Sequence, residues 1–116
     1  VKAGARFFQT QAVYDVGQFR AFMEEIGKCG ISTPVMAGIV LLKSAGMARY
    51  MNKSVAGVSV PDGLIKEMEE AKDKAATSIE IAARLITALK GLCRGIHIMP
   101  IGWDKKVPLV LRAASL

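Results

Sequence analysis

The sequence predicts an α/β fold built on parallel strands, and two observations carry this prediction. Short apolar segments alternate with longer segments whose apolar residues recur every three or four positions, in the order β-α-β-α-(α)-β-α. Helical segments separate the strands, which is the pattern of βαβ units around a parallel sheet. Because such folds bind ligands beyond the carboxyl ends of their strands, functional residues are expected directly after each strand.

The first strand is predicted over residues 5–11, which follow a glycine and are partly aromatic and β-branched. A helix then begins at Asp15, which can cap its amino end, with Gln18 at the spacing of a capping box. Apolar residues recur on one face of this helix, and Gly30 ends it. The apolar run over residues 34–40 begins with proline and is typical of a buried parallel strand.

Residues 43–52 are predicted to form a short helix, whereas residues 54–60 fit no single pattern. Pro61 and Asp62 are typical of a helix amino terminus. Two apolar stripes follow, one ending at Ala71 and one running over residues 79–89, and they form either two helices or one long one.

A third strand is predicted over residues 95–101, and residues 107–114 form a last short helix. Three strands make a poor independent domain, because a parallel sheet needs cover on both faces and at both edges. The opening residues 1–4 carry neither an initiator methionine nor a signal peptide. We therefore expect residues 1–116 to be a single segment of a larger protein.

Composition excludes several classes of function. The 116 residues are 52% hydrophobic, which argues against disorder, and no apolar run approaches the roughly 18 residues of a membrane span. The net charge is +6, but the basic residues are spread along the chain, so no nucleic-acid partner is expected. The chain also lacks the glycine-rich phosphate loops and the Gly-x-Ser-x-Gly elbow, which argues against nucleotide-loop and hydrolase functions.

The two cysteines and the single histidine indicate no metal site. Cys29 and Cys93 are far apart in sequence, and neither has a partner at the spacing of a zinc site. His97 lies inside an apolar strand, where a core histidine is more common than a catalytic one. Isolated cysteines without a secretion signal are typical of reduced thiols, so a cytoplasmic protein is expected.

Four motifs, in order along the chain, resemble the methylenetetrahydrofolate reductase family. Residues 4–15 (GARFFQTQAVYD) resemble its G-A-x-x-x-x-T-Q-x-x-F/Y-D signature. Residues 34–39 are similar to its I-x-P-G-I strand, and residues 60–64 to the segment that opens its next helix. Residues 95–99 are similar to its last strand, G-V-x-x-x-H-F-Y. The resemblance covers essentially the whole chain.

The resemblance implies the C-terminal portion, about strands six to eight with their helices, of a TIM (β/α)8 barrel, which needs about 250 residues when complete. Members of the family are flavoproteins that pass a hydride through FAD to methylenetetrahydrofolate. Most FAD contacts and the acidic catalytic residues belong to earlier strands, so no catalytic residue is expected here. The full-length protein is therefore expected to be an oxidoreductase of one-carbon metabolism, and this segment alone to be inactive.

The resemblance also implies substrate-binding residues. Gln11 stands where the family has a glutamine that binds the pterin, and an amide suits the edge of a heterocycle because it both donates and accepts. Ser59 and Trp103 replace a substrate-contacting glutamine and an arginine that helps to hold the folate. Tryptophan can stack on a ring but cannot pair with a carboxylate. Tyr14 either lines the site or packs as a hydrophobic staple before the helix.

Two alternatives stay open at this point. The replacements at Ser59 and Trp103 are compatible with a noncatalytic assembly domain derived from the same barrel. A pterin methyltransferase on the same barrel type is a second alternative. In the first hypothesis the partners are a folate or another pterin substrate and the remaining half of the barrel. Because an isolated segment would have open sheet edges, a homo-oligomer is also expected.

Overall fold

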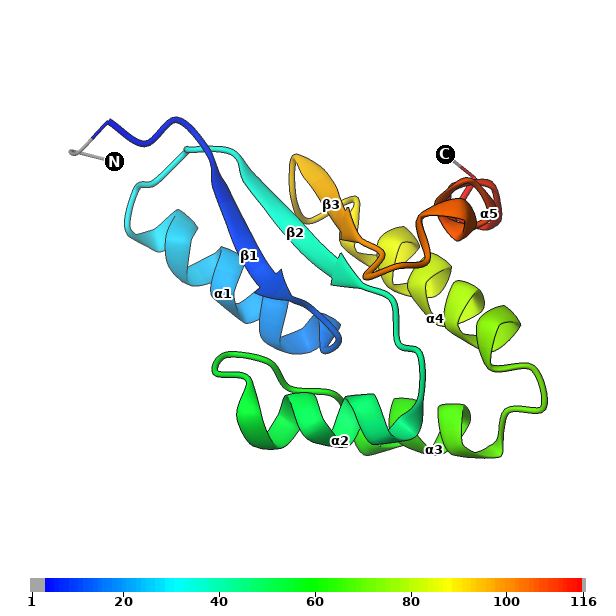
Figure 1. Cartoon of the computed structure of the whole chain (residues 1–116). Helices are drawn as coiled ribbons and strands as arrows, with labels where there is room; N and C mark the ends of the chain where they lie inside the picture. Colours follow the sequence, from blue (N-terminus) through cyan, green and yellow to red (C-terminus); the bar gives the residue numbers. More distant parts are fainter. Residues whose placement is uncertain (1–3, 116) are drawn as a thin grey trace.

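The computed structural model describes residues 4–115, and these contain three strands, five α-helices and one 3-10 turn (Figure 1). In chain order the elements are β1 (Phe8–Ala12), α1 (Val16–Lys28), β2 (Val35–Val40), α2 (Ala45–Ser54), α3 (Asp62–Glu70), α4 (Lys74–Leu89), β3 (Gly95–Met99), η1 (Asp104–Lys106) and α5 (Val107–Ala113). The strands form one parallel sheet in the order β1-β2-β3. The predicted α/β class with parallel strands is confirmed. Residues 1–3 of the opening segment lie outside the described residues.

The first helix begins and ends where the sequence predicts. The Asp15 carboxylate accepts a hydrogen bond of 3.0 Å from the backbone N–H of Gln18 and so satisfies one of the free amides of the first turn. At the other end, Gly30 has a φ of +74°, a left-handed conformation that glycine adopts without strain. These two signals fix how far α1 runs before the chain returns to the sheet as β2.

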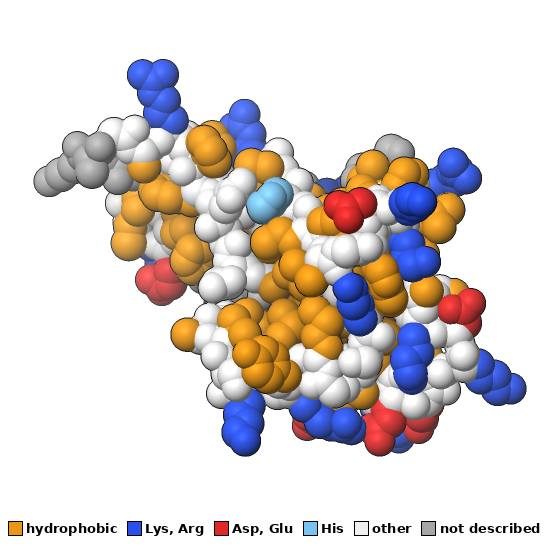
Figure 2. Space-filling model, in the orientation of Figure 1, with side chains coloured by type: hydrophobic (Ala, Val, Ile, Leu, Met, Phe, Trp, Pro, Cys, Tyr) orange, Lys and Arg blue, Asp and Glu red, His pale blue; other side chains and the backbone are white. Residues whose placement is uncertain are grey.

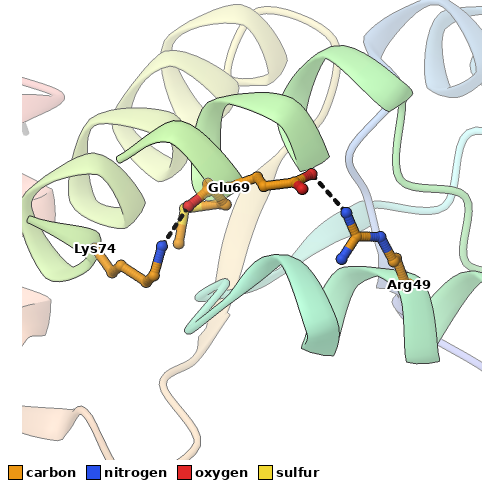
Figure 3. A network of polar contacts seen from close by, with 4 residues as sticks. Arg49, Glu69 and Lys74 are labelled. Atoms are coloured by element: carbon orange, nitrogen blue, oxygen red, sulfur yellow. Dashed lines mark hydrogen bonds and ion pairs between the residues drawn. The ribbon is translucent and has the colours of Figure 1, made fainter. Parts of the chain in front are cut away.

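The two apolar stripes between Pro61 and Leu89, for which the sequence allowed one long helix or two, form two helices, α3 and α4. Ala71 is extended, with a ψ of 129°, and the Asp73 carboxylate caps α4 by accepting from the Ala76 N–H at 3.1 Å. Figure 3 shows Lys74 at this break, and beside it the ion pair of Glu69 with Arg49 of α2. The Lys74 ammonium donates to the main-chain oxygen of Met68 at 2.7 Å and so satisfies a carbonyl near the end of α3. The break lets α3 pack against α2 while α4 packs against the sheet.

Loss of the Asp73 cap is expected to destabilise the protein. The Asp73→Ala variant leaves the Ala76 N–H without its acceptor, and we expect the free energy of unfolding to fall by about 1 kcal/mol. The Asp73→Asn variant keeps a capping oxygen and is expected to lose only a few tenths of that amount. Urea unfolding of both variants provides the measurement. Equal losses would show that the charge of Asp73, and not its cap, contributes the stability.

The hydrophobic core lies between the sheet and the helices that cover it. On β2 the side chains of Val35, Ala37 and Ile39 are almost completely buried, and α4 contributes Ile86 and Leu89 to the same cluster. Since side chains alternate along a strand, the residues between these three point to the opposite face of the sheet. In Figure 1, α2 and α3 lie beyond the carboxyl ends of β1 and β2. No helix of the described residues is long and apolar enough to cross a membrane.

Candidate functional site

A cleft of about 450 Å³ lies beside β1, at the start of α1 and against the loop that precedes α3. Its volume is within the range of sites for small molecules, about 300–1,000 Å³. Three of the four predicted substrate-binding residues line it, namely Gln11, Tyr14 and Ser59. The other lining residues are Phe8, Gln9, Thr10, Ala12, Val13, Asp15, Gln18, Phe19, Phe22, Val35 and Gly57.

A β-bulge in β1 sets the position of Gln11. Gln9 pairs with Met36 and Ala12 pairs with Gly38, so two residues of β1, Thr10 and Gln11, stand opposite a single residue of β2. A bulge of this kind bends the strand and re-aims its side chains, and bulges are common next to active sites. The bulge therefore presents the exposed Gln11 side chain to the cleft at the carboxyl end of β1.

The Thr10 side chain takes the place of backbone hydrogen bonds that the bulge interrupts. Its hydroxyl accepts from the Gly38 N–H at 3.0 Å and donates to the Gln11 carbonyl oxygen at 2.7 Å. The normal ladder resumes one residue beyond the strand, where the Val13 N–H donates to the Gly38 carbonyl at 2.9 Å. The threonine of the Thr-Gln pair thus fixes the backbone on which the glutamine is carried.

Glycine at position 38 is required by the close approach of the bulge. A Cβ built on Gly38 would lie 2.7 Å from the Thr10 carbonyl oxygen and 3.1 Å from that of Gln11. Both neighbours are backbone atoms, so they cannot move aside as the end of a flexible side chain would. The two strands can hold this register only without a side chain at position 38.

The loop before α3 brings Ser59 to the same cleft. Gly57 of this loop has a φ of +81°, and a Cβ built on it would lie 3.7 Å from the Cγ of Gln11. Ser59 is exposed on the cleft side, whereas Val58 and Val60 are buried on either side of it. Asn52 fixes the end of the loop, because its side-chain amide accepts from the Val60 N–H and donates to the Val60 carbonyl.

Tyr14 is part of the cleft wall, and its hydroxyl is already engaged in a hydrogen bond. The side chain is only 3% exposed, and its hydroxyl donates to the carbonyl oxygen of Val40, the last residue of β2, at 2.7 Å. Burial raises the pKa of the Tyr14 phenol above its usual value, so the group stays neutral. Tyr14 and Phe19 are both buried in the core and stand at the two positions of a hydrophobic staple. Tyr14 therefore offers the cleft an apolar surface and ties the β1–α1 turn to β2.

Trp103 does not line this cleft. It follows β3 and is half-buried against the core, where the ammonium groups of Lys43 and Lys106 approach its ring. The structure thus brings Gln11, Tyr14 and Ser59 together and places Trp103 in a separate group, nearer to β2 and β3. The sequence could not separate them, because contacts between segments so far apart in the chain leave no local pattern.

The cleft is rich in amides and has a single charged side chain in its lining. Three glutamines, Gln9, Gln11 and Gln18, line it together with the rings of Phe19 and Phe22. Asp15 is the one charged lining residue, and its carboxylate is occupied in capping α1. Such a lining suits a flat, uncharged heterocycle whose edge donates and accepts hydrogen bonds, and it offers no acid or base for proton transfer. Within residues 4–115, no group of three or more His, Cys, Asp or Glu side chains converges to hold a metal.

Sequence reasoning missed Thr10, Gly38 and Gly57 as residues that position the site. A bulge leaves no periodic pattern in the sequence, so nothing in the sequence indicated that the Thr10 side chain bonds to the neighbouring strand. Gly38 lies inside an apolar run, where a glycine often marks a bulge or a close backbone approach, and this signal could have been used.

Two comparisons with known proteins bear on the family of this chain. The family model described as methylenetetrahydrofolate reductase matches residues 1–115. A relative named methylenetetrahydrofolate reductase 1, from Schizosaccharomyces pombe, is 26% identical over 121 residues, covering 100% of this chain. The chain spans only about a fifth (20%) of the length of that relative. A parallel α/β sheet with a family match of this extent fits a fragment of a TIM barrel. The chain belongs to the methylenetetrahydrofolate reductase family.

Proposed function

We propose that this chain supplies one wall of the folate site in a flavin-dependent methylenetetrahydrofolate reductase-like oxidoreductase. The observation that carries the proposal is the bulge in β1, which presents Gln11 to an amide-lined cleft at the carboxyl end of the strand. In this proposal β1, β2 and β3 are strands six, seven and eight of the (β/α)8 barrel. Family membership supports a folate-related oxidoreductase.

Each wall residue has a role that follows from its chemistry. The Gln11 amide donates one hydrogen bond to the pterin edge and accepts another, which fixes the orientation of the ring. Ser59 adds a hydroxyl from the opposite loop, and the Tyr14 ring provides an apolar surface for the ring system. The chain binds and orients the substrate in this proposal and contributes no acid or base to the cleft.

Most of the flavin contacts are proposed to lie outside this chain. A flavin dinucleotide needs cations or free backbone amides for its pyrophosphate, and the residues that line the cleft include no lysine, arginine or histidine. The cleft therefore offers the pyrophosphate no cation. We assign most of the flavin contacts to the earlier strands of the barrel, and the proposed role of the cleft uses no flavin contact.

The remaining half of the barrel is the proposed partner of this chain and would pair with the open edge of its sheet at β1. In the described chain β1 is an edge strand, and two large apolar side chains lie exposed near it, Phe7 at 58% and Phe22 at 47%. Figure 2 shows hydrophobic side chains gathered over the middle of one face, with basic side chains scattered around its margin. A preceding strand and helix would pair with β1 and cover these side chains. In a chain without that half, a second copy would take its place and give a homo-oligomer.

Replacement of Gln11 tests the proposed function. In the intact protein, Gln11→Ala removes both hydrogen bonds to the pterin, and we expect kcat/KM for methylenetetrahydrofolate to fall about tenfold or more. Reaction of the electron donor with an artificial acceptor bypasses the folate and is expected to stay unchanged. Steady-state kinetics of both reactions supply the measurement.

Gln9→Ala is the matched control. Gln9 is also exposed and also lines the cleft, but it lies two residues closer to the amino end of β1. We expect its loss to change kcat/KM for the folate less than twofold. Unchanged folate kinetics for Gln11→Ala, or equal losses for the two variants, would contradict the placement of the pterin at the carboxyl end of the strand.

A further inference from the structure

Two lysines approach the ring of Trp103 from different segments of the chain. The Nζ of Lys43, which follows β2, lies 5.6 Å from the ring centroid, and the Nζ of Lys106, which ends η1, lies 5.3 Å from it. Both distances are within the range of about 6 Å for attraction between a cation and an aromatic face. The group therefore stands beyond the carboxyl ends of β2 and β3, separate from the cleft beside β1.

These two cations differ from the other basic side chains of the described residues in their burial. Lys43 and Lys106 are half-buried, whereas each of the other lysines and arginines in residues 4–115 is exposed. The ion pairs found in this range use Glu25, Glu67 and Glu69, and none includes either lysine. Asp104, the nearest acid in sequence, is exposed. Half-buried ammonium groups without a carboxylate keep a local positive potential that a bound anion can neutralise.

The turn after β3 is shaped to admit Lys43. Ile101 and Gly102 both have left-handed backbones, with φ values of +49° and +89°. A Cβ built on Gly102 would lie 3.1 Å from the Nζ of Lys43, so a larger residue there would press on the ammonium group. A left-handed isoleucine is strained and persists only where the surrounding structure holds it in place.

We propose that Lys43, Lys106 and Trp103 form an oxyanion-binding site for a carboxylate or phosphate group of a ligand bound at the carboxyl edge of the sheet. The two ammonium groups donate charge-assisted hydrogen bonds to the oxyanion, and the Trp103 ring holds their side chains in place. Trp103 cannot pair with a carboxylate, and the two lysines beside it supply the missing charge. The site is independent of Gln11, because it lies outside the cleft that Gln11 lines.

Two pairs of probes test this site on the intact protein, and each pair shares a ring but differs in its anionic group. Tetrahydrofolate carries two carboxylates that are esterified in its dimethyl ester, and flavin mononucleotide carries a phosphate that riboflavin lacks. We expect Lys43→Gln and Lys106→Gln each to weaken binding of the anionic member of one pair about five- to tenfold, with its uncharged partner unchanged. The affected pair identifies the source of the anion. Titration calorimetry gives the dissociation constants.

Lys105→Gln is the matched control, because Lys105 is adjacent to Lys106 in sequence but exposed. Lys105→Gln is expected to change no dissociation constant of either pair by more than twofold. Lys43→Arg keeps the positive charge and is expected to bind the anionic probe as the unmodified protein does. If Lys43→Gln and Lys106→Gln weakened binding of the charged and the uncharged member of a pair equally, the proposal would be overturned, because the lysines would then have a structural role. Unchanged binding of both pairs, no binding of any probe by the unmodified protein, or an equal effect of Lys105→Gln would also overturn it. Folate binding that depends on Gln11 but not on the lysines would leave the proposed function standing without this site.

Discussion

Gly38→Ala is expected to lower the free energy of unfolding by about 3 kcal/mol, the upper end of what overpacking costs. The added methyl group would lie 2.7 Å from the Thr10 carbonyl oxygen and 3.1 Å from that of Gln11. Relief requires β1 to move away from β2, which would break the hydrogen bond from the Gly38 N–H to the Thr10 hydroxyl. The same displacement would move Gln11, so we also expect weaker folate binding. Urea unfolding and a folate titration measure the two effects.

Gly27→Ala is the control for this variant, and its expected effect has the opposite sign. Gly27 lies in α1, and a Cβ built on it meets no atom within 4 Å. Alanine is the better helix former, so the free energy of unfolding is expected to rise by about 0.5–1 kcal/mol. A Gly38→Ala protein as stable as the unmodified one would show that the β1–β2 register does not depend on the absence of a side chain.

Tyr14→Phe is expected to lower the free energy of unfolding by about 2 kcal/mol at neutral pH. The variant keeps the ring but leaves the Val40 carbonyl oxygen without the hydroxyl that bonds to it at 2.7 Å. Because this bond ties the β1–α1 turn to the end of β2, its loss also loosens one wall of the cleft. Urea unfolding at pH 7 measures the change in stability.

The Tyr14 contribution is also expected to depend on pH in the alkaline range. Burial raises the pKa of the Tyr14 phenol, so above the usual value of about 10 the unfolded chain releases this proton and the folded chain retains it. The stability that this group contributes is complete below pH 10 and declines as the pH rises further. The difference between the unmodified protein and Tyr14→Phe should therefore shrink between pH 10 and pH 11.

Tyr50→Phe serves as the comparison, because Tyr50 is 63% exposed. We expect it to change stability by less than 0.5 kcal/mol, as surface substitutions usually do, and to leave the alkaline decline in place. A difference between Tyr14→Phe and the unmodified protein that stays constant up to pH 11 would contradict the assignment of the decline to the buried phenol.

The element order and most helix boundaries could be predicted because local chemistry determines them. Asp15 and Gly30 mark the ends of α1 through a side-chain cap and a left-handed glycine, and both signals act within a few residues. The continuous apolar run over residues 34–40 likewise identified the buried strand β2. The sequence did not decide whether α3 and α4 are one helix or two, because the break between them depends on which neighbours each helix packs against.

By itself the sequence determined the α/β class, the direction of the strands and the Thr-Gln motif at the end of the first one. The tertiary structure alone decided how that motif is used. The bulge that aims Gln11 arises from the pairing of β1 with β2, so Thr10 and Gly38 acquire their roles from atoms 28 residues away in the chain. Trp103 separates from Gln11 and meets Lys43 for the same reason. Contacts between distant segments leave no local period in a sequence, and only the folded chain brings them together.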